Sequence, residues 1–128
     1  MRPKTPILLY CADRELLSTM AFALRLHPYE VTAVEDSRNA AALMMTGNTE
    51  LVCGILIHAQ QGDLAGRLIY RLLEVDLHVP VLLVDRAGDL APVRYADMVL
   101  YGRNTSMAHI LGALNVLCAR KRVPRRAA

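Results

Sequence analysis

The feature that most constrains the fold is a series of five short apolar segments, separated by stretches of helical or polar character. They cover residues 7–11, 29–36, 51–57, 79–85 and 97–101. Most are apolar at consecutive positions, which is typical of strands buried on both faces of a parallel sheet. The alternation of strands and helices predicts a doubly wound α/β fold with five parallel strands and helices on both faces.

Helix signals occupy most of the intervening stretches. Apolar residues at helical spacing predict helices after the first, second and third strands, the third over residues 64–75. Residues 86–96 give only a weak or distorted helix, and a clear apolar stripe follows the fifth strand. Short polar side chains mark the helix starts, and a glycine marks one end. The expected N-caps are Asp13, Asp36 or Ser37, and Thr105 or Ser106, and the expected C-cap is Gly47.

Length and charge indicate one domain with a basic tail. The chain has 128 residues, of which 54% are hydrophobic, enough for a single core. Five positive charges lie in the last nine residues, and removing them from the net charge of +3 leaves −2. A mildly acidic body argues against direct nucleic-acid binding by the domain itself. We therefore expect a domain over residues 1–121, with residues 122–128 as a solvated tail or a linker to an output domain.

Cysteine usage and hydropathy favour a cytoplasmic protein. Cys11, Cys53 and Cys118 are widely spaced and form no CxxC motif, which argues against a disulfide framework or a zinc site. The apolar stretch near the N-terminus is too short for a signal peptide, and no segment has the length of a membrane span. The sequence thus predicts no contact with membrane.

Candidate functional residues follow the predicted strands, because ligands of such folds gather at the carboxyl ends of the strands. His58 ends the third apolar segment abruptly and opens a polar loop. The groups at the other strand ends are Cys11-Ala12-Asp13, Asp85-Arg86 and Tyr101-Gly102-Arg103.

Four stretches resemble the receiver domain of bacterial response regulators. ILLYCADRELL is similar to the family's ILLVDDDPELL, and YEVTAVEDSRNAAALM to YEVVTAEDGEEALELL. VPVLLVD resembles IPVIVLTA, and YADMVLYGR resembles GADDYLVKP. The resemblance extends from residue 5 to about residue 121. It implies the CheY-like, flavodoxin-like strand order 2-1-3-4-5 and a role in signal transduction.

The family's phosphorylation chemistry has almost no counterpart here. The resemblance places the magnesium-binding acidic pair at Cys11 and Ala12, with Asp13 at the third position of the acidic run. It implies His58 at the phosphoacceptor aspartate, Asp85 at the Thr or Ser position and Gly102 at the lysine, with Arg103 next to it. The chain thus resembles a pseudo-receiver, which is not an enzyme, needs no cofactor and acts through protein contacts without aspartyl phosphorylation.

Several alternatives remain open. His58 and Asp85 can form a hydrogen-bonded or ionic pair that fills the vacated pocket and responds to pH. His58 could instead accept a phosphoryl group, or bind a metal together with Asp13 and Asp85, although no close ligand spacing supports a metal. Cys11 could act as the nucleophile of a phosphocarrier or phosphatase, but its loop has no glycine to cradle an anion. A small-ligand sensor is the third possibility.

The partner surface is expected by resemblance at the face formed by the fourth helix, the fifth strand and the fifth helix. Tyr101 lies near the position of the family's aromatic switch residue, and Gly112 allows close backbone approach. The partner would be another protein or a second copy of the chain. The expected contact residues are Tyr101, His109, Gly112 and Asn115.

Overall fold

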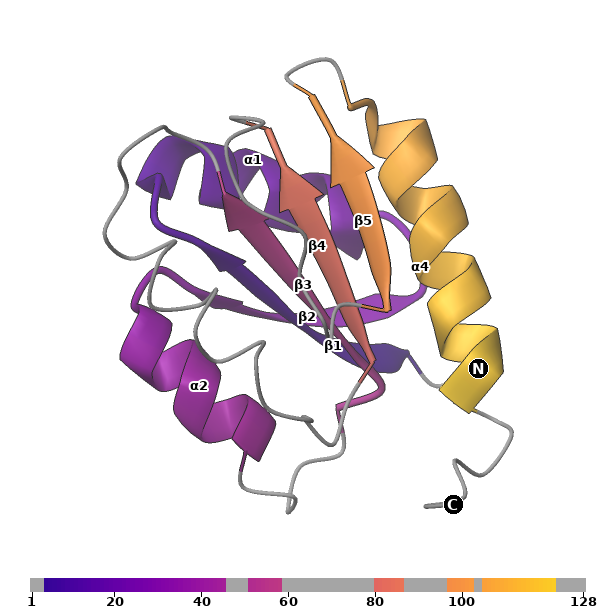
Figure 1. Ribbon diagram of the computed structural model, residues 1–128, viewed down its shortest axis with the longest axis horizontal. Coiled ribbons are helices and arrows are strands. Elements are labelled where there is room, and N and C mark those ends of the chain that lie inside the picture. The colour runs from indigo at the N-terminus through magenta and orange to yellow at the C-terminus, as the bar shows by residue number, and fades with distance from the viewer. Residues whose placement is uncertain (1–3, 46–50, 59–79, 87–96, 103–104, 122–128) are drawn as a thin grey trace.

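The computed structural model describes residues 4–45, 51–58, 80–86, 97–102 and 105–121. Five parallel strands form one sheet in the order β2-β1-β3-β4-β5 (Figure 1). This result confirms the predicted fold class and strand order. The strands are β1 (Thr5–Cys11), β2 (Tyr29–Val34), β3 (Cys53–His58), β4 (Val81–Asp85) and β5 (Met98–Tyr101).

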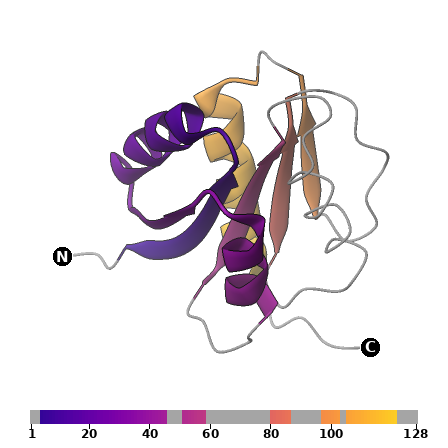
Figure 2. The same ribbon diagram turned by 90° about the vertical axis from the view of Figure 1, so that its left-hand side faces the viewer.

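Helices pack on both faces of the sheet (Figure 2). The described helices are α1 (Arg14–Arg25), α2 (Ser37–Met45) and α4 (Met107–Lys121). Buried residues of α1 and α4 share one apolar cluster with the strands, and α2 contributes to a second cluster on the opposite face. We call these two sides the α1/α4 face and the α2 face.

Alternating side chains of each strand enter these two clusters. In β1, Ile7, Leu9 and Cys11 join the cluster of the α1/α4 face, whereas Leu8 and Tyr10 join that of the α2 face. Successive side chains of a strand point to opposite faces of the sheet. A strand covered on both sides therefore needs apolar residues at consecutive positions, which explains the pattern in the sequence.

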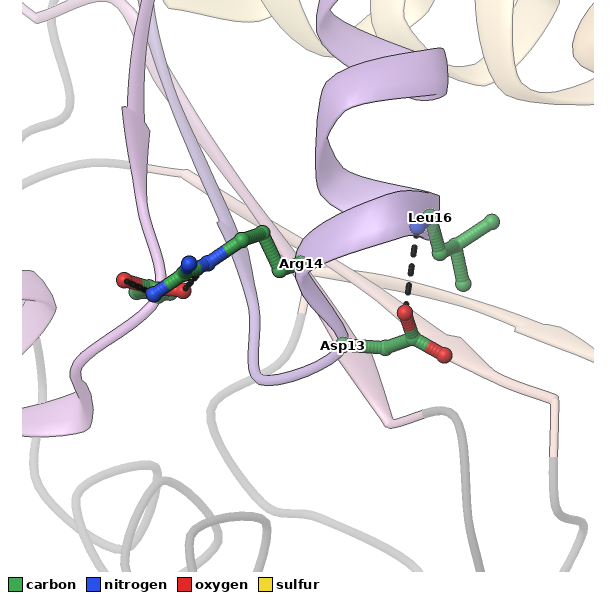
Figure 3. Close-up of polar contacts among 4 residues, drawn as sticks. Asp13, Arg14 and Leu16 are labelled. Carbon is green, nitrogen blue, oxygen red and sulfur yellow. Dashed lines mark hydrogen bonds and ion pairs between the residues drawn. The ribbon is translucent and has the colours of Figure 1, made fainter.

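Short polar side chains start the helices as the sequence predicts. Asp13 is the N-cap of α1, and its Oδ1 accepts a hydrogen bond from the backbone N–H of Leu16 at 3.2 Å (Figure 3). Asp36 accepts from the backbone N–H of Arg38 at 2.9 Å at the start of α2. Ser106 accepts from the backbone N–H of His109 at 3.2 Å at the start of α4. These contacts satisfy N–H groups that have no partner inside the helix.

Some strand limits differ from the prediction. The second strand ends at Val34 rather than at residue 36, because Asp36 is used to cap α2. The third runs from Cys53 to His58 rather than over residues 51–57, so the expectation that His58 opens a loop was wrong. His58 stays in the strand because it continues the pairing with β4. The fifth begins one residue later than expected, and Asp97 instead accepts a hydrogen bond from the backbone N–H of Val81 at 2.8 Å.

Several predictions fall outside the described residues: the helix over 64–75, the weak helix after residue 86, the C-cap at Gly47, and the tail over 122–128. The helices that the structure describes include none with the length and apolar character needed to cross a membrane.

Candidate functional site

The carboxyl edge of the sheet collects most of the predicted site residues. Cys11, His58 and Asp85 are the last residues of β1, β3 and β4, and Tyr101 is the last residue of β5. His58 and Asp85 are the two buried polar or charged residues of the described chain, with 3% and 0% of their surfaces exposed. Since burial of such groups costs free energy unless polar neighbours compensate, their position at adjacent strand ends is the main feature of this edge.

His58 and Asp85 are direct neighbours across the sheet. They are register partners of the parallel β3–β4 pair, and the backbone N–H of Arg86 donates to the carbonyl of His58 at 3.0 Å. Neighbouring strands lie about 4.8 Å apart, and paired residues project from the same face. By alternation that face is the α2 face, which Leu56 and Leu83 also enter. An imidazole and a carboxyl group are thus side by side in a buried setting.

Tyr10 adds a third buried polar group that the sequence reasoning missed. It is 1% exposed, lies in the cluster of the α2 face, and pairs in register with Leu56, two residues before His58. Its phenol therefore projects from the same face as His58 and Asp85, one step further from the carboxyl edge. In the sequence it looked like an ordinary apolar member of the first strand. Strand alternation, combined with the register that only the structure gives, would have identified it.

Cys11 lies on the other face of the sheet. It is fully buried in the cluster of the α1/α4 face and pairs in register with Ile57. Adjacent residues of a strand point in opposite directions, so Ile57 and His58 project from opposite faces. The structure therefore does not bring Cys11 to the face that carries His58 and Asp85. Its burial among apolar side chains leaves it out of reach of a soluble substrate.

Ala12 and Asp13 connect β1 to α1. Ala12 is exposed, and Asp13 is partly buried and engaged in capping the helix (Figure 3). In the chain that the structure describes, no three His, Cys, Asp or Glu side chains are grouped so that they could hold a metal ion. The structure thus gives Asp13 a local role in starting α1.

Gly102 occupies a backbone conformation that favours glycine. Its φ angle is +100°, a region that residues with a Cβ rarely adopt. Its N–H donates to the carbonyl of Asp85 at 3.0 Å, and its own carbonyl accepts from the Oγ1 of Thr105 at 2.9 Å. Gly102 therefore connects the end of β4 to the start of α4. Arg103 lies outside the described residues.

An exposed ion pair lies at the start of α1. The guanidinium of Arg14 donates from Nε and from a terminal nitrogen to the two carboxylate oxygens of Glu35, at 3.1 and 3.2 Å (Figure 3). These bonds raise the pKa of Arg14 above its ordinary value. Because arginine is already charged at any physiological pH, the pair links α1 to the end of β2 without acting as a switch.

The residues expected at a partner surface lie at the end of β5 and on α4. Tyr101 is 62% exposed at the end of β5, and His109 and Gly112 are exposed on α4. A Cβ on Gly112 would meet no atom within 4 Å, so none of the residues that the structure describes covers this position. Asn115 is exposed as well, but its Oδ1 accepts a hydrogen bond from the hydroxyl of Tyr29 in β2.

Comparison with known proteins gives structural similarity only. No protein-family model and no curated protein matches the sequence. The structure is similar to the signal receiver domain of an HD domain-containing protein from Pseudomonas fluorescens Pf-5, with a TM-score of 0.71 and 18% identity over 95% of this chain and 92% of that chain.

Two further solved structures agree. One is a CheY-like response regulator receiver domain protein from Methanospirillum hungatei JF-1, with a TM-score of 0.69 and 13% identity over 93% of this chain and 97% of that chain. The other is the signal receiver domain of a LuxO repressor protein, described as putative, from Vibrio parahaemolyticus, with a TM-score of 0.68 and 13% identity over 93% of both chains. Together with the strand order, these similarities show that the chain has the fold of the CheY-like response-regulator receiver domains.

Proposed function

We propose that this chain is a receiver-like regulatory domain that acts in signal transduction through protein contacts, without conventional aspartyl phosphorylation. The observation that carries the proposal is the buried pair of His58 and Asp85 at the ends of β3 and β4. In the receiver fold, these strand ends surround the phosphoryl group. Here they hold an imidazole and a carboxyl group instead of an acceptor carboxylate and a hydroxyl.

Charge and chemistry argue against phosphotransfer at this edge. A carboxylate at Asp85 repels a phosphoryl group, whereas a hydroxyl would donate a hydrogen bond to it. Magnesium requires oxygen ligands, but Cys11 carries sulfur and belongs to the other face, and Ala12 has no polar side chain. Gly102 stands at the family's lysine position but has no side chain to carry a positive charge, and its positive φ angle disfavours a residue with a long side chain. Each substitution removes a different part of the usual mechanism.

The remaining function of such a domain is recognition. The exposed Tyr101, together with His109 and Gly112 on α4, offers a surface of aromatic and neutral polar character for a protein partner or a second copy. Aromatic side chains contribute strongly to protein interfaces. We expect a cytoplasmic regulator that is not an enzyme, and in which a segment after α4 could lead to an output domain.

The deciding experiment is the intact mass of the folded protein after incubation with acetyl phosphate and magnesium. We expect no gain of a phosphoryl group, because His58 is buried and the described residues of the carboxyl edge include no group of side chains that could hold a metal ion. The same measurement on His58→Ala and on His109→Ala provides the controls. His109 is exposed, so its variant tests whether this surface histidine accepts phosphate.

A phosphoryl gain that persists in His109→Ala and is lost in a folded His58→Ala would contradict the proposal and make His58 a working phosphoacceptor. A gain that depends on His109 would be surface labelling and would leave the carboxyl edge silent. Circular dichroism of each variant shows whether the fold is retained.

A further inference from the structure

The amino edge of the sheet, opposite the candidate site, brings a tyrosine and a thiol to the same face. Tyr29 is the first residue of β2 and Cys53 the first residue of β3, and β1 lies between them. In register, Thr5 pairs with Tyr29 and Ile7 pairs with Cys53. Because Thr5 and Ile7 are two residues apart, all four side chains project from the same face. Tyr29 and Cys53 accordingly belong to the cluster of the α1/α4 face.

Helix α4 brings a second thiol to this edge. The hydroxyl of Tyr29 donates a hydrogen bond to Oδ1 of Asn115 in α4. Cys118 follows Asn115 by three residues, so the two lie next to each other on one side of the helix. Cys118 is partly buried and packs against the same apolar cluster that contains Tyr29 and Cys53. Since α4 also packs against β3, the two thiols approach Tyr29 from the helix and from the sheet.

The electrostatics of Tyr29 agree with this arrangement. Burial is the main cause that raises the pKa of its phenol, and the neighbouring thiols of Cys118 and Cys53 raise the pKa further. Charges act on a titrating group over short distances within a protein. Both thiols therefore lie within electrostatic range of the phenol, which is consistent with their shared apolar cluster.

We propose that Cys53 and Cys118 form a redox-sensitive pair that closes an intramolecular disulfide when a hydroperoxide oxidises the protein. Cys118 is the more accessible thiol, so its thiolate attacks the peroxide first. The O–O bond breaks, sulfenic acid forms on Cys118, and an alcohol or water leaves. The sulfur of Cys53 then attacks the sulfur of Cys118, the S–S bond forms, and water leaves. Two thiols and one peroxide thus give one disulfide.

The bond would fasten the end of α4 to the start of β3. A disulfide requires the two Cα atoms to lie within about 7 Å, so the bond would hold the last turns of α4 against the start of β3. The crosslink would close residues 53–118 into one loop and reduce the conformational freedom of the unfolded chain. The oxidised protein should accordingly melt at a higher temperature than the reduced one. In a reducing compartment the thiol form is the resting state.

The test treats the folded, reduced protein with hydrogen peroxide, blocks remaining thiols under denaturing conditions, and measures intact mass and peptide maps. We expect the mass to fall by two hydrogen atoms and one thiol to remain alkylatable. The peptide map should contain a peptide that links Cys53 to Cys118. Cys11 lies at the opposite end of β1, so Cys11→Ala should form the same bond. Cys118→Ser and Cys53→Ala should not form it. The melting temperature should rise on oxidation and return after addition of a reductant.

Three results would overturn the proposal. They are oxygen added to Cys118 without loss of two hydrogen atoms, a covalent dimer joined through Cys118, and three alkylatable thiols after treatment. Cys53 is fully buried, so its variant could fail to fold. Cys118→Ser then tests at a less buried position whether the disulfide needs this pair of cysteines.

Discussion

We expect His58 and Asp85 to depend on each other for their burial, because they are buried register partners at the ends of β3 and β4. Removing one member of a buried polar pair leaves the other in an apolar setting without its neighbour, whereas removing both replaces the pair by packing. We expect His58→Leu and Asp85→Leu each to lower the free energy of unfolding by about 3–5 kcal/mol. The double variant should lose less than the sum, with a coupling of about 0.5–3 kcal/mol. Urea unfolding of the four proteins measures this cycle.

The control for this cycle uses an exposed histidine. His109→Leu combined with Asp85→Leu should be additive, since α4 carries His109 on its exposed side. Additive losses for His58 and Asp85 themselves, within about 0.5 kcal/mol, would show that the two groups do not interact.

Substitutions of Asp13 can separate its role as a helix cap from the effect of its negative charge. Its carboxylate caps α1, and an asparagine can accept the same hydrogen bond from the backbone N–H of Leu16. We expect Asp13→Ala to lower the free energy of unfolding by about 0.5–2 kcal/mol, and Asp13→Asn to retain most of the stability. Urea unfolding checks both variants. An equal loss in the two variants would indicate that the charge matters and that capping does not explain this residue.

The contact between β2 and α4 gives an element-scale prediction. The raised pKa of Tyr29 means that the folded state holds the phenol proton more tightly than the unfolded chain, whose tyrosine titrates near pH 10. The resulting stability is fully present below about pH 10 and is lost as the pH rises through the folded pKa. The stability advantage of the wild type over Tyr29→Phe should therefore shrink above pH 10. Denaturant unfolding across this range measures it.

A matched variant distinguishes this effect from general alkaline unfolding. Tyr101→Phe removes an exposed hydroxyl and should leave the pH profile of the wild type unchanged. A difference between wild type and Tyr29→Phe that stays constant with pH would mean that the phenol has the same pKa in the folded and unfolded states, and it would contradict the prediction.

At the scale of elements, the sequence predicted strand order and helix starts well but strand ends less well. Apolar runs and capping residues are local signals, so they survive in a single sequence. Whether His58 ends β3 or begins a loop depends on its pairing with Asp85, 27 positions away in sequence. The bond between Tyr29 and Asn115, 86 positions apart, is likewise a result of packing. Such contacts leave no periodic pattern to read.

Recognition by the whole molecule can be tested at Tyr101. If the proposed surface joins two copies, sedimentation velocity should show a mass that rises with protein concentration, and Tyr101→Ala should abolish the rise. Since Tyr101 is exposed, the substitution should change the free energy of unfolding by less than about 0.5 kcal/mol. Phe22→Ala is the control, because Phe22 is also an exposed aromatic residue but belongs to α1.

A rise that disappears in Phe22→Ala and persists in Tyr101→Ala would move the interface to α1. The sequence predicted that Cys11, His58 and Asp85 lie at the carboxyl ends of neighbouring strands, but it did not predict the faces on which their side chains lie. The faces on which these side chains lie follow from register and alternation, and these placed Cys11 away from His58 and brought in Tyr10.

The hydrogen bonds around Gly102 connect the end of β4 to the start of α4. One end of this 15-residue helix follows a segment bonded to the carbonyl of Asp85, while Asn115 contacts the first residue of β2 at the opposite edge. A helix of this length spans about 22 Å. If α4 tilted slightly at the end beside Asp85, its other end, about 22 Å away, would be displaced. Under the proposed function, α4 would couple the two edges of the sheet mechanically, and such coupling would not depend on a phosphoryl group.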